Sequence, residues 1–345
     1  RRGRDTIALH GKDVFRHRWS SPLELSRIQG PIDHKAGRAF YGGVAGPVFG
    51  HLITQSLGRL WAAPPDVPIL FISVNPAFVE LPKYFITLIR KLGLNNPIEL
   101  ITNHCRVDEL IVAEDRFNLE RPVRISPDYS DWLLQIRKDV PLQEDLFLYV
   151  SRAQLGPTSG QYLQEIALED ALRAQGYTVI YPESLPIEQQ IDLYLRAKRL
   201  IFADGSAVHL WSLFASAQQI AAVICRRAPH VKMNRLLAAF ERANPIFFDC
   251  RLAEFSGNKR GANSSVALLD MDQVWRRLRR RGFHSKRHLY FPLRASVMDW
   301  LATLQEGADP NRAPPFELDQ TSRDLLAIRP AVTFSIPKRL VQPPP

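Results

Sequence analysis

The stretch Arg199-Leu200-Ile201-Phe202-Ala203-Asp204-Gly205-Ser206-Ala207-Val208-His209 decides the fold class, because its periodicity changes in the middle. Residues 200–203 form a continuous apolar run with the length of a buried strand, and apolar residues recur with helical spacing from Ala207 onward. Gly205 lies at the junction, where a residue without a side chain lets the backbone turn sharply. A strand that leads directly into a helix is typical of an α/β protein with parallel sheets.

The same alternation extends along most of the chain. In the N-terminal half, a glycine loop at 42–47 leads into an amphipathic helix at 49–61, followed by strands at 69–74, 98–102 and 110–113 and by helices at 79–92 and 129–137. In the C-terminal half, strands at 146–150, 179–181, 200–203 and 222–225 alternate with helices at 162–174, 187–198 and 207–218. Two such series predict two Rossmann-like doubly wound α/β domains, with a ligand at the carboxyl ends of the strands. We place these domains at residues 1–143 and 144–305, followed by a Pro-rich C-terminal arm or tail at 306–345.

The composition fits a globular protein that contacts anionic partners. Of the 345 residues, 46% are hydrophobic and 23% are charged, and no apolar run reaches the length of a membrane helix. Lys and Arg number 45 against 35 for Asp and Glu, so the formal net charge of +10 favours contact with phosphates, anionic lipid or nucleic acid. The 3 cysteines lie far apart without a C-x-x-C pair, which favours a reducing compartment. We therefore expect a cytoplasmic protein without a zinc site.

The turn after residues 200–203 has the properties of an anion-binding site. The free N–H groups of Ser206, Ala207 and Val208 would point along the helix dipole toward a bound anion, which Gly205 would allow to approach closely. Asp204 could accept a hydrogen bond from a ribose or sugar hydroxyl. The alternative is that Asp204 or Ser206 only caps the helix, and these residues alone do not decide between the two.

A second polar turn follows the predicted strand at 146–150. Ser151 and Arg152 leave this strand with a hydroxyl and a guanidinium group, a pair suited to gripping a diphosphate. An arginine at a strand end is also commonly a solvated residue. The position at the start of the second α/β series gives weight to the phosphate-binding interpretation.

Three polar residues of the predicted helix at 49–61 would share one face. His51, Gln55 and Arg59 follow one another at the i, i+4 and i+8 positions, and such a stripe could line a cleft. His51 is the member that can act as a base near neutral pH. The alternative is a histidine that is hydrogen-bonded near a helix start and has no catalytic role.

Two further polar segments favour structural roles. A D-x-D pair that begins at Asp270 resembles a metal site, but Gln273 stands at capping-box spacing, so we predict a helix cap and no metal. The basic segment from Arg276 to Arg281 could contact an anionic membrane surface, although a solvated helix face is the first interpretation. No zinc-finger or RNP-type motif accompanies it, so no specific nucleic acid is expected.

P-loop, G-x-S-x-G and H-E-x-x-H motifs are also absent from the sequence, which leaves a nucleotide-linked transferase as the main enzyme class.

Several short motifs, taken in order from about residue 41 to residue 214, resemble glycosyltransferase family 61. This group includes bacterial capsular polysaccharide biosynthesis proteins and eukaryotic xylosyl and N-acetylglucosaminyl transferases. The motifs are Phe49-Gly50-His51 with Arg59-Leu60-Trp61, Tyr149-Val150-Ser151-Arg152, Gln164-Glu165, Glu188-Gln189-Gln190-Ile191, and Asp204-Gly205-Ser206-Ala207 with His209.

The resemblance implies a GT-B fold and inverting transfer of a sugar from a nucleotide-sugar donor to a cell-surface or capsular polysaccharide or another glycan acceptor. The N-terminal domain would face the acceptor and the C-terminal domain would hold the donor, without a cofactor or a chelated divalent metal. His51 would be catalytic, with Gln55 and Arg59 on the acceptor side. The cysteine pattern and the basic segment from Arg276 to Arg281, taken with this activity, predict a cytoplasmic enzyme that is peripheral at the inner face of the membrane. The residues implied in donor binding are Ser151, Arg152, Glu165, Gln190, Asp204, Gly205, Ser206, Ala207 and His209.

Two positions depart from the family pattern. Gln55 stands where family members often carry a carboxylate. Family members also often carry a basic residue just before an Asn-Glu pair, and this sequence has Gln161-Tyr162-Leu163-Gln164 there instead. Because an amide cannot act as a general base, that role falls to His51 or to a carboxylate elsewhere in the sequence. These departures keep open a catalytically inactive scaffold that binds an anionic partner or membrane surface. A nucleic-acid-binding protein is the weaker third alternative.

Overall fold

The computed structural model describes residues 30–74, 77–116, 125–155, 159–227, 237, 240, 242–256 and 266–286. It also gives the backbone of three short strands, β1 (Ile7–His10), β2 (Asp13–Arg16) and β14 (Glu317–Leu318). The predicted Pro-rich arm at 306–345 lies outside the described residues, apart from β14. No helix in the described ranges is both long and apolar enough to cross a membrane.

The first sheet has four parallel strands in the order β5-β4-β3-β6. These are β3 (Asp33–Ala45), β4 (Ile69–Ser73), β5 (Ile98–Ile101) and β6 (Cys105–Ile111). Helix α1 (Phe49–Gln55) connects β3 to β4, and α2 (Lys83–Lys91) connects β4 to β5. Helix α3 (Pro127–Leu134) and the 3-10 helix η3 (Gln135–Arg137) then lead toward the second sheet.

The loop predicted at Gly42 and Gly43 is wrong, because both glycines lie inside β3, a central strand of the first sheet. A Cβ added to Gly42 would lie 2.8 Å from Ile69 Cγ2 and 2.9 Å from Phe71 Cε1, so this position has no room for a side chain. Gly43 has a φ of 110° at a register shift between β3 and β4, which is the geometry of a β-bulge. The glycines therefore allow close strand packing and do not mark a chain reversal.

The second sheet has five parallel strands in the order β11-β10-β9-β7-β8. Its strands are β7 (Gln143–Val150), β8 (Tyr177–Ile180), β9 (Ala197–Ala203), β10 (Ile220–Ile224) and β11 (Ile246–Phe248). Helices α4 (Glu165–Arg173), α5 (Ile187–Arg196) and α6 (Ala207–Phe214) alternate with them, and the 3-10 helix η5 (Pro182–Ser184) precedes α5. The predicted α/β class with parallel sheets is thus confirmed.

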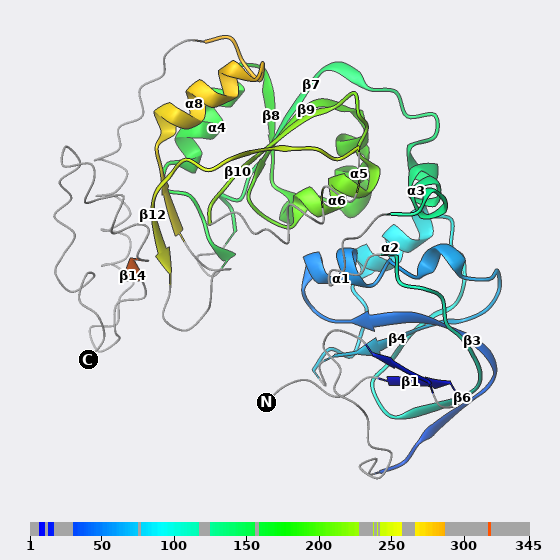
Figure 1. Ribbon diagram of the computed structural model, residues 1–345. Coiled ribbons are helices and arrows are strands. Elements are labelled where there is room, and N and C mark those ends of the chain that lie inside the picture. The colour runs from blue at the N-terminus through cyan, green and yellow to red at the C-terminus, as the bar shows by residue number, and fades with distance from the viewer. Residues whose placement is uncertain are drawn as a thin grey trace, which may run out of the picture.

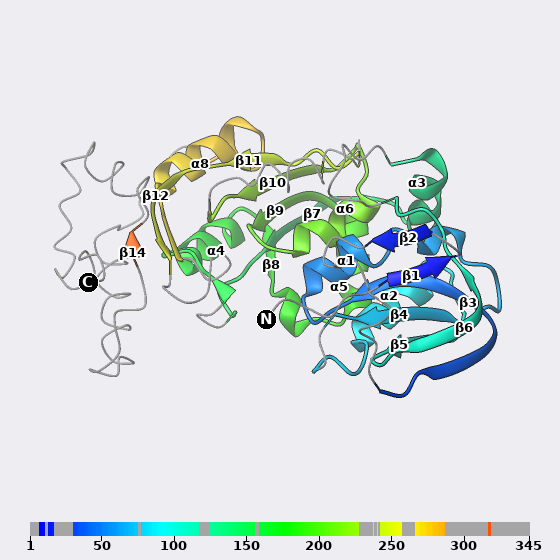
Figure 2. The ribbon, with the colours of Figure 1, turned by 60° about the horizontal axis from the view of Figure 1, so that its bottom comes forward.

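A third, antiparallel sheet follows the second one. It pairs β12 (Arg251–Ser256) with β13 (Val266–Leu269) and with β14, and β13 leads into α8 (Met271–Arg280). The Asp270 side chain accepts a hydrogen bond from the N–H of Gln273 at 2.9 Å, so the predicted helix cap is confirmed. Figure 2 shows α8 close to α4, away from the first sheet.

The two parallel sheets face each other across their helices. Figure 1 shows α1 and α2 against the first sheet and α5 and α6 against the second, with all four helices between the sheets. Helix α1 contacts α6, and α2 contacts α5. One apolar cluster includes Phe71 of β4 and Phe202 of β9, so it continues from one sheet to the other. The predicted domain boundary at residues 143 and 144 falls at the start of β7 and stays a prediction.

The second sheet is buried on both faces because its side chains alternate along each strand. Leu200 and Phe202 of β9 pack in the cluster shared with the first sheet, whereas Ile201 packs in a second cluster. That second cluster contains Leu168 of α4 and Trp275 of α8. This arrangement fixes the position of the carboxyl ends of β7, β9 and β10, where the polar residues gather.

Candidate functional site

A cavity of about 700 Å³ opens between the helices of the two sheets. One wall comes from the second sheet and its helices, and includes the ends of β7 and β9 and the start of α6. The facing wall comes from α1 and α2 of the first sheet. A volume of this size lies in the range of small-molecule and cofactor sites.

The predicted turn between β9 and α6 forms part of the cavity wall, through Gly205, Ser206 and Ala207. Ser206 is the N-cap residue of α6, but its side chain makes no capping hydrogen bond, and no acidic residue lies in the first turn of this fully described helix. The alternative in which Ser206 only caps the helix is therefore wrong. The first N–H groups of α6 and the positive end of the helix dipole are available to an anion in the cavity.

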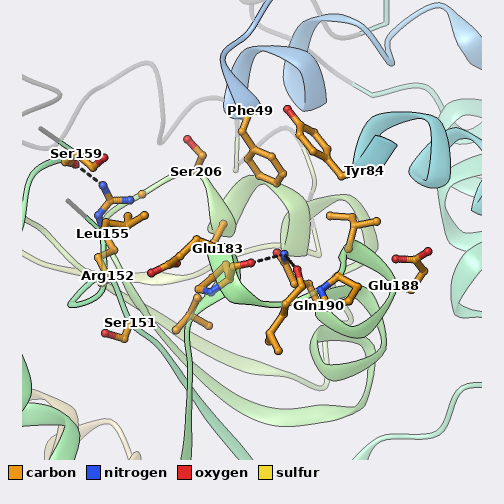
Figure 3. A pocket seen from close by; sticks show the side chains of 18 of the residues that line it. Phe49, Tyr84, Ser151, Arg152, Leu155, Ser159, Glu183, Glu188, Gln190 and Ser206 are labelled. Carbon is orange, nitrogen blue, oxygen red and sulfur yellow. Dashed lines mark hydrogen bonds between the residues drawn. The ribbon is translucent and has the colours of Figure 1, made fainter. Parts of the chain in front are cut away.

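Arg152 lies directly against this turn. A Cβ added to Gly205 would overlap Nη1 of Arg152 and would lie 3.2 Å from its Cζ, so the glycine makes room for the guanidinium group. Nη2 of Arg152 donates a hydrogen bond to the carbonyl oxygen of Ser159, as Figure 3 shows. Within the described ranges, the buried Nε of Arg152 has no hydrogen-bond partner. The sequence prediction that Arg152 and the Gly205 turn meet at one site is consistent with this geometry.

Ser151 and Glu165 stabilise the exit of β7. Oε1 of Glu165 accepts hydrogen bonds from the N–H of Arg152 at 2.8 Å, from the Tyr149 hydroxyl at 2.9 Å and from Ser151 Oγ at 3.1 Å. Burial raises the pKa of Glu165, although these hydrogen bonds oppose the shift. Ser151 lines the cavity, whereas Glu165 lies behind its wall. The structure thus gives Glu165 a positioning role for Arg152.

Gln190 lines the cavity and holds the segment before α5. Its Nε2 donates to the carbonyl oxygens of Pro182 at 2.7 Å and Leu185 at 2.9 Å. The amide therefore fixes the shape of this part of the wall, in addition to any contact with a ligand.

Asp204 ties the ends of β9 and β10 together and does not line the cavity. It is 1% exposed, and its Oδ2 accepts from the N–H of Arg226 at 3.3 Å and pairs with Arg227 Nε at 3.5 Å. These contacts also argue against a helix cap formed by the Asp204 side chain. The sequence interpretation overlooked Arg226 and Arg227, although two arginines directly after a buried strand were a usable signal.

His51 and His209 lie near the contact between α1 and α6. A Cβ added to Gly50 would lie 2.7 Å from Ser206 Oγ and 3.8 Å from His209 Cδ2, so the two helices meet at this glycine. Burial lowers the pKa of His209 to about 4, and the neighbouring His51 and Arg227 add to this effect. His209 is therefore neutral at physiological pH. His51 is exposed on α1, and neither histidine is among the residues that line the cavity.

The single polar face predicted for His51, Gln55 and Arg59 is wrong. Helix α1 ends at Gln55, and a turn with the 3-10 helix η2 (Leu60–Ala62) replaces the rest of the predicted helix. Arg59 Nη1 instead pairs with Asp115 Oδ2 at 2.9 Å, and its guanidinium lies 5.3 Å from the centre of the Tyr41 ring. Arg59 thus has a structural role, and the Gln55 side chain lies outside the described part of the structure.

The sequence interpretation expected the helix that begins at Phe49 to face a cleft, but it did not single out the part of the wall that α2 contributes. Phe49 of α1 and Lys83, Tyr84 and Thr87 of α2 line the cavity. The pattern of an amphipathic helix shows which face of the helix is apolar. It does not show that a cavity lies between one end of that face and the other sheet. For Lys83, Tyr84 and Thr87 the sequence held no local signal, whereas Phe49 belongs to a motif of the family resemblance.

A comparison with known families identifies the family of the chain. The family model described as Glycosyltransferase 61 matches residues 49–221, from the start of α1 to β10. The matched region contains both walls of the cavity and the turn that begins at Asp204. No curated protein matches the chain. Because the family model covers half of the sequence, the chain belongs to glycosyltransferase family 61.

Proposed function

We propose that the chain is an inverting glycosyltransferase with GT-B architecture, which uses a nucleotide-sugar donor and a glycan acceptor. Membership of the family indicates a glycosyltransferase, and two parallel sheets that face each other across a cavity are compatible with this architecture. The observation that carries the proposal is the contact of Arg152 with Gly205 at the N-terminus of α6.

The diphosphate of the donor would lie at this contact. A helix N-terminus supplies N–H donors and a positive dipole end, and an adjacent guanidinium adds charge-assisted hydrogen bonds to phosphate oxygens. The buried Nε of Arg152, which lacks a partner among the described residues, fits an anionic ligand at this position. The same groups would stabilise the negative charge that develops on the diphosphate as it leaves.

His51 is the proposed general base of the transfer. It would take the proton of the acceptor hydroxyl while the hydroxyl oxygen bonds to the anomeric carbon and the bond from that carbon to the diphosphate oxygen breaks. Its exposed position on α1, close to His209 at the start of α6, supports this role. No divalent metal takes part in the proposed step.

The first test measures nucleotide binding. We expect at least one of UDP, GDP, ADP, CDP and dTDP to raise the melting temperature of the purified chain, because a ligand that binds the folded state stabilises it. Arg152→Ala should weaken that binding about 10- to 100-fold, since hydrogen bonds to charged groups contribute about 1.5–3 kcal/mol. The matched control is Arg196→Ala on α5, whose arginine pairs with Asp192. Absence of binding by the whole panel, or unchanged binding in Arg152→Ala, contradicts the donor site.

The second test separates an enzyme from an inactive scaffold. We expect His51→Ala to lower turnover of nucleotide sugars about 100-fold or more while nucleotide binding stays within a few-fold, because general-base catalysis contributes about 10²–10⁴ in rate. His34→Ala is the control, since His34 is an exposed histidine that pairs with Asp108. Nucleotide binding without turnover in the unaltered chain, across a panel of nucleotide sugars and glycans, supports the scaffold.

The acceptor is proposed to be a growing cell-surface or capsular polysaccharide or a related glycan, made by a cytoplasmic enzyme at the inner face of the membrane. The feature that supports membrane contact is the exposed face of α8. Arg276 and Arg280 are exposed on the helix, and Arg281 and Lys286 are exposed just after it. Such a basic surface favours anionic lipid head groups.

A further inference from the structure

Two aromatic side chains from the first sheet's helices line the cavity opposite the second sheet. Phe49 is the first residue of α1 and Tyr84 is the second residue of α2. Their ring centroids lie 5.2 Å apart at an interplanar angle of 50°, and both side chains are partly buried. Both residues line the cavity, and Figure 3 shows their rings side by side. They form one aromatic surface that spans two helices.

This aromatic surface starts beside the phosphate-binding turn and extends away from it. The Gly50 backbone packs against Ser206, which places Phe49 next to the start of α6. In Figure 3, Phe49 lies between Ser206 and Tyr84, and Tyr84 lies farther from Arg152 than Phe49 does. The order along the cavity is therefore the guanidinium group, the helix N-terminus, the first ring and the second ring.

The cavity wall where α5 begins combines apolar side chains with the carboxylates of Glu183 and Glu188. Leu185, Pro186 and Ile187 line the cavity in the segment where α5 begins, and α5 is the helix that α2 contacts. The amide of Gln190 holds this segment through its hydrogen bonds to Pro182 and Leu185. A flat ligand group at this end would thus have an aromatic ring on one side and apolar side chains on the other, with the carboxylates of Glu183 and Glu188 in reach of its polar edge or of a ribose.

We propose that Tyr84 and Phe49 bind the nucleoside end of the donor, with the nucleobase held between Tyr84 and the segment that begins α5. A nucleoside diphosphate has a charged end and a flat aromatic end separated by a ribose, which matches the order of groups along the cavity. Nucleobases stack on aromatic side chains whatever the base, because every base has a π face. The inference rests on the proposed function, since it places the diphosphate at Arg152.

The surroundings of Tyr84 favour a nucleobase over an acceptor sugar. An acceptor must reach the proposed base His51, which is absent from the lining of the cavity, whereas Tyr84 lines it. Donor binding would consequently need both sheets, because the base contacts a helix of the first and the diphosphate contacts the second.

The test compares a ligand that has a base with one that lacks it. The full chain and its Tyr84→Ala, Tyr84→Phe and Phe49→Leu variants are titrated with the nucleoside diphosphate, chosen from UDP, GDP, ADP, CDP and dTDP, that binds the unaltered chain most tightly. Inorganic pyrophosphate is then used to displace that nucleotide from each variant. We expect Tyr84→Ala to weaken nucleotide binding about 10- to 100-fold, Phe49→Leu to weaken it less, and Tyr84→Phe to retain it. The pyrophosphate inhibition constant should stay unchanged in all variants, which also shows that they fold.

The other possible outcomes show which of the two proposals fails. Unchanged nucleotide binding in Tyr84→Ala overturns the inference. Equal weakening of nucleotide and pyrophosphate binding overturns it as well, because the ring then acts on the shape of the whole cavity. If no nucleoside diphosphate binds the unaltered chain, the proposed function itself is wrong, and Arg152→Ala tests that separately.

Discussion

At Gly205 the missing side chain leaves the space that the Arg152 guanidinium occupies. A Cβ here would overlap Arg152 Nη1, and the guanidinium can move away at little cost because it ends a flexible side chain. We therefore expect Gly205→Ala to fold with nearly unchanged stability but to bind nucleoside diphosphates about 10-fold or more weakly. Calorimetric titration checks the affinity, and thermal unfolding checks the stability.

A double-mutant cycle tests whether Gly205→Ala weakens nucleotide binding by displacing Arg152. If Gly205→Ala acts by displacing Arg152, then adding it to Arg152→Ala causes little further loss, because the two residues share one interaction. Fully additive losses would show that the alanine blocks the phosphate directly and that the contact with Arg152 is incidental.

The roles of Glu165 and Asp204 depend on neighbouring residues in the fold that the local sequence does not reveal. Glu165 and Asp204 stand at positions where the family resemblance implies donor contacts, but both are buried behind the cavity wall. Glu165 accepts the backbone N–H of Arg152, and Asp204 pairs with Arg227. Buried carboxylates need hydrogen bonds and opposite charges, so their partners decide what they do.

Among the elements, α8 carries the charge that the sequence analysis singled out. The helix buries Val274, Trp275 and Leu278 in the second apolar cluster and exposes Arg276 and Arg280 on the other side. Its long basic side chains therefore extend into solvent from a firmly packed helix. Such an element can present positive charge to a flat anionic surface without changing its own conformation.

We expect the variant with Arg276→Gln, Arg280→Gln and Arg281→Gln to lose affinity for vesicles that contain anionic lipid by about 100-fold, since each basic residue near such a surface contributes about 1 kcal/mol. Co-sedimentation with these vesicles measures the effect, with neutral phosphatidylcholine vesicles and the Lys91→Gln variant of α2 as controls. Equal binding of the unaltered chain to neutral and anionic vesicles, or an unchanged triple variant, contradicts membrane contact through α8.

Elements of the second sheet were easier to predict than those of the first. Strands β7, β8, β9 and β10 are short apolar runs bounded by clear turns, and all four were expected within a few residues of their observed bounds. Strand β3 was overlooked because its glycines read as a loop. Gly42 is required by the close approach of β4, and Gly43 by the positive φ at the register shift, and no local pattern contains either long-range requirement.

At the scale of the whole molecule, the apolar cluster shared by the two sheets explains why the cavity has two walls. Leu52 of α1, Leu88 of α2, Ile191 of α5 and Leu210 of α6 all belong to this cluster. The helices of the two sheets are thus packed together at one end and leave a cavity of about 700 Å³ where their N-termini meet. A ligand in this cavity contacts both sheets at once.

Periodicity, glycine placement and motif order are local properties of the chain, and they were enough to predict the α/β class, the parallel sheets, the family and the turn at Gly205 as an anion-binding candidate. Only the tertiary structure decided that Arg152 lies against Gly205, that Asp204 and Glu165 hold other residues in place, and that Phe49 and Tyr84 face the same cavity. These facts depend on which strand ends and helix ends meet in space. The packing of one sheet's helices against the other's fixes those meetings, and it involves residues far apart in the chain.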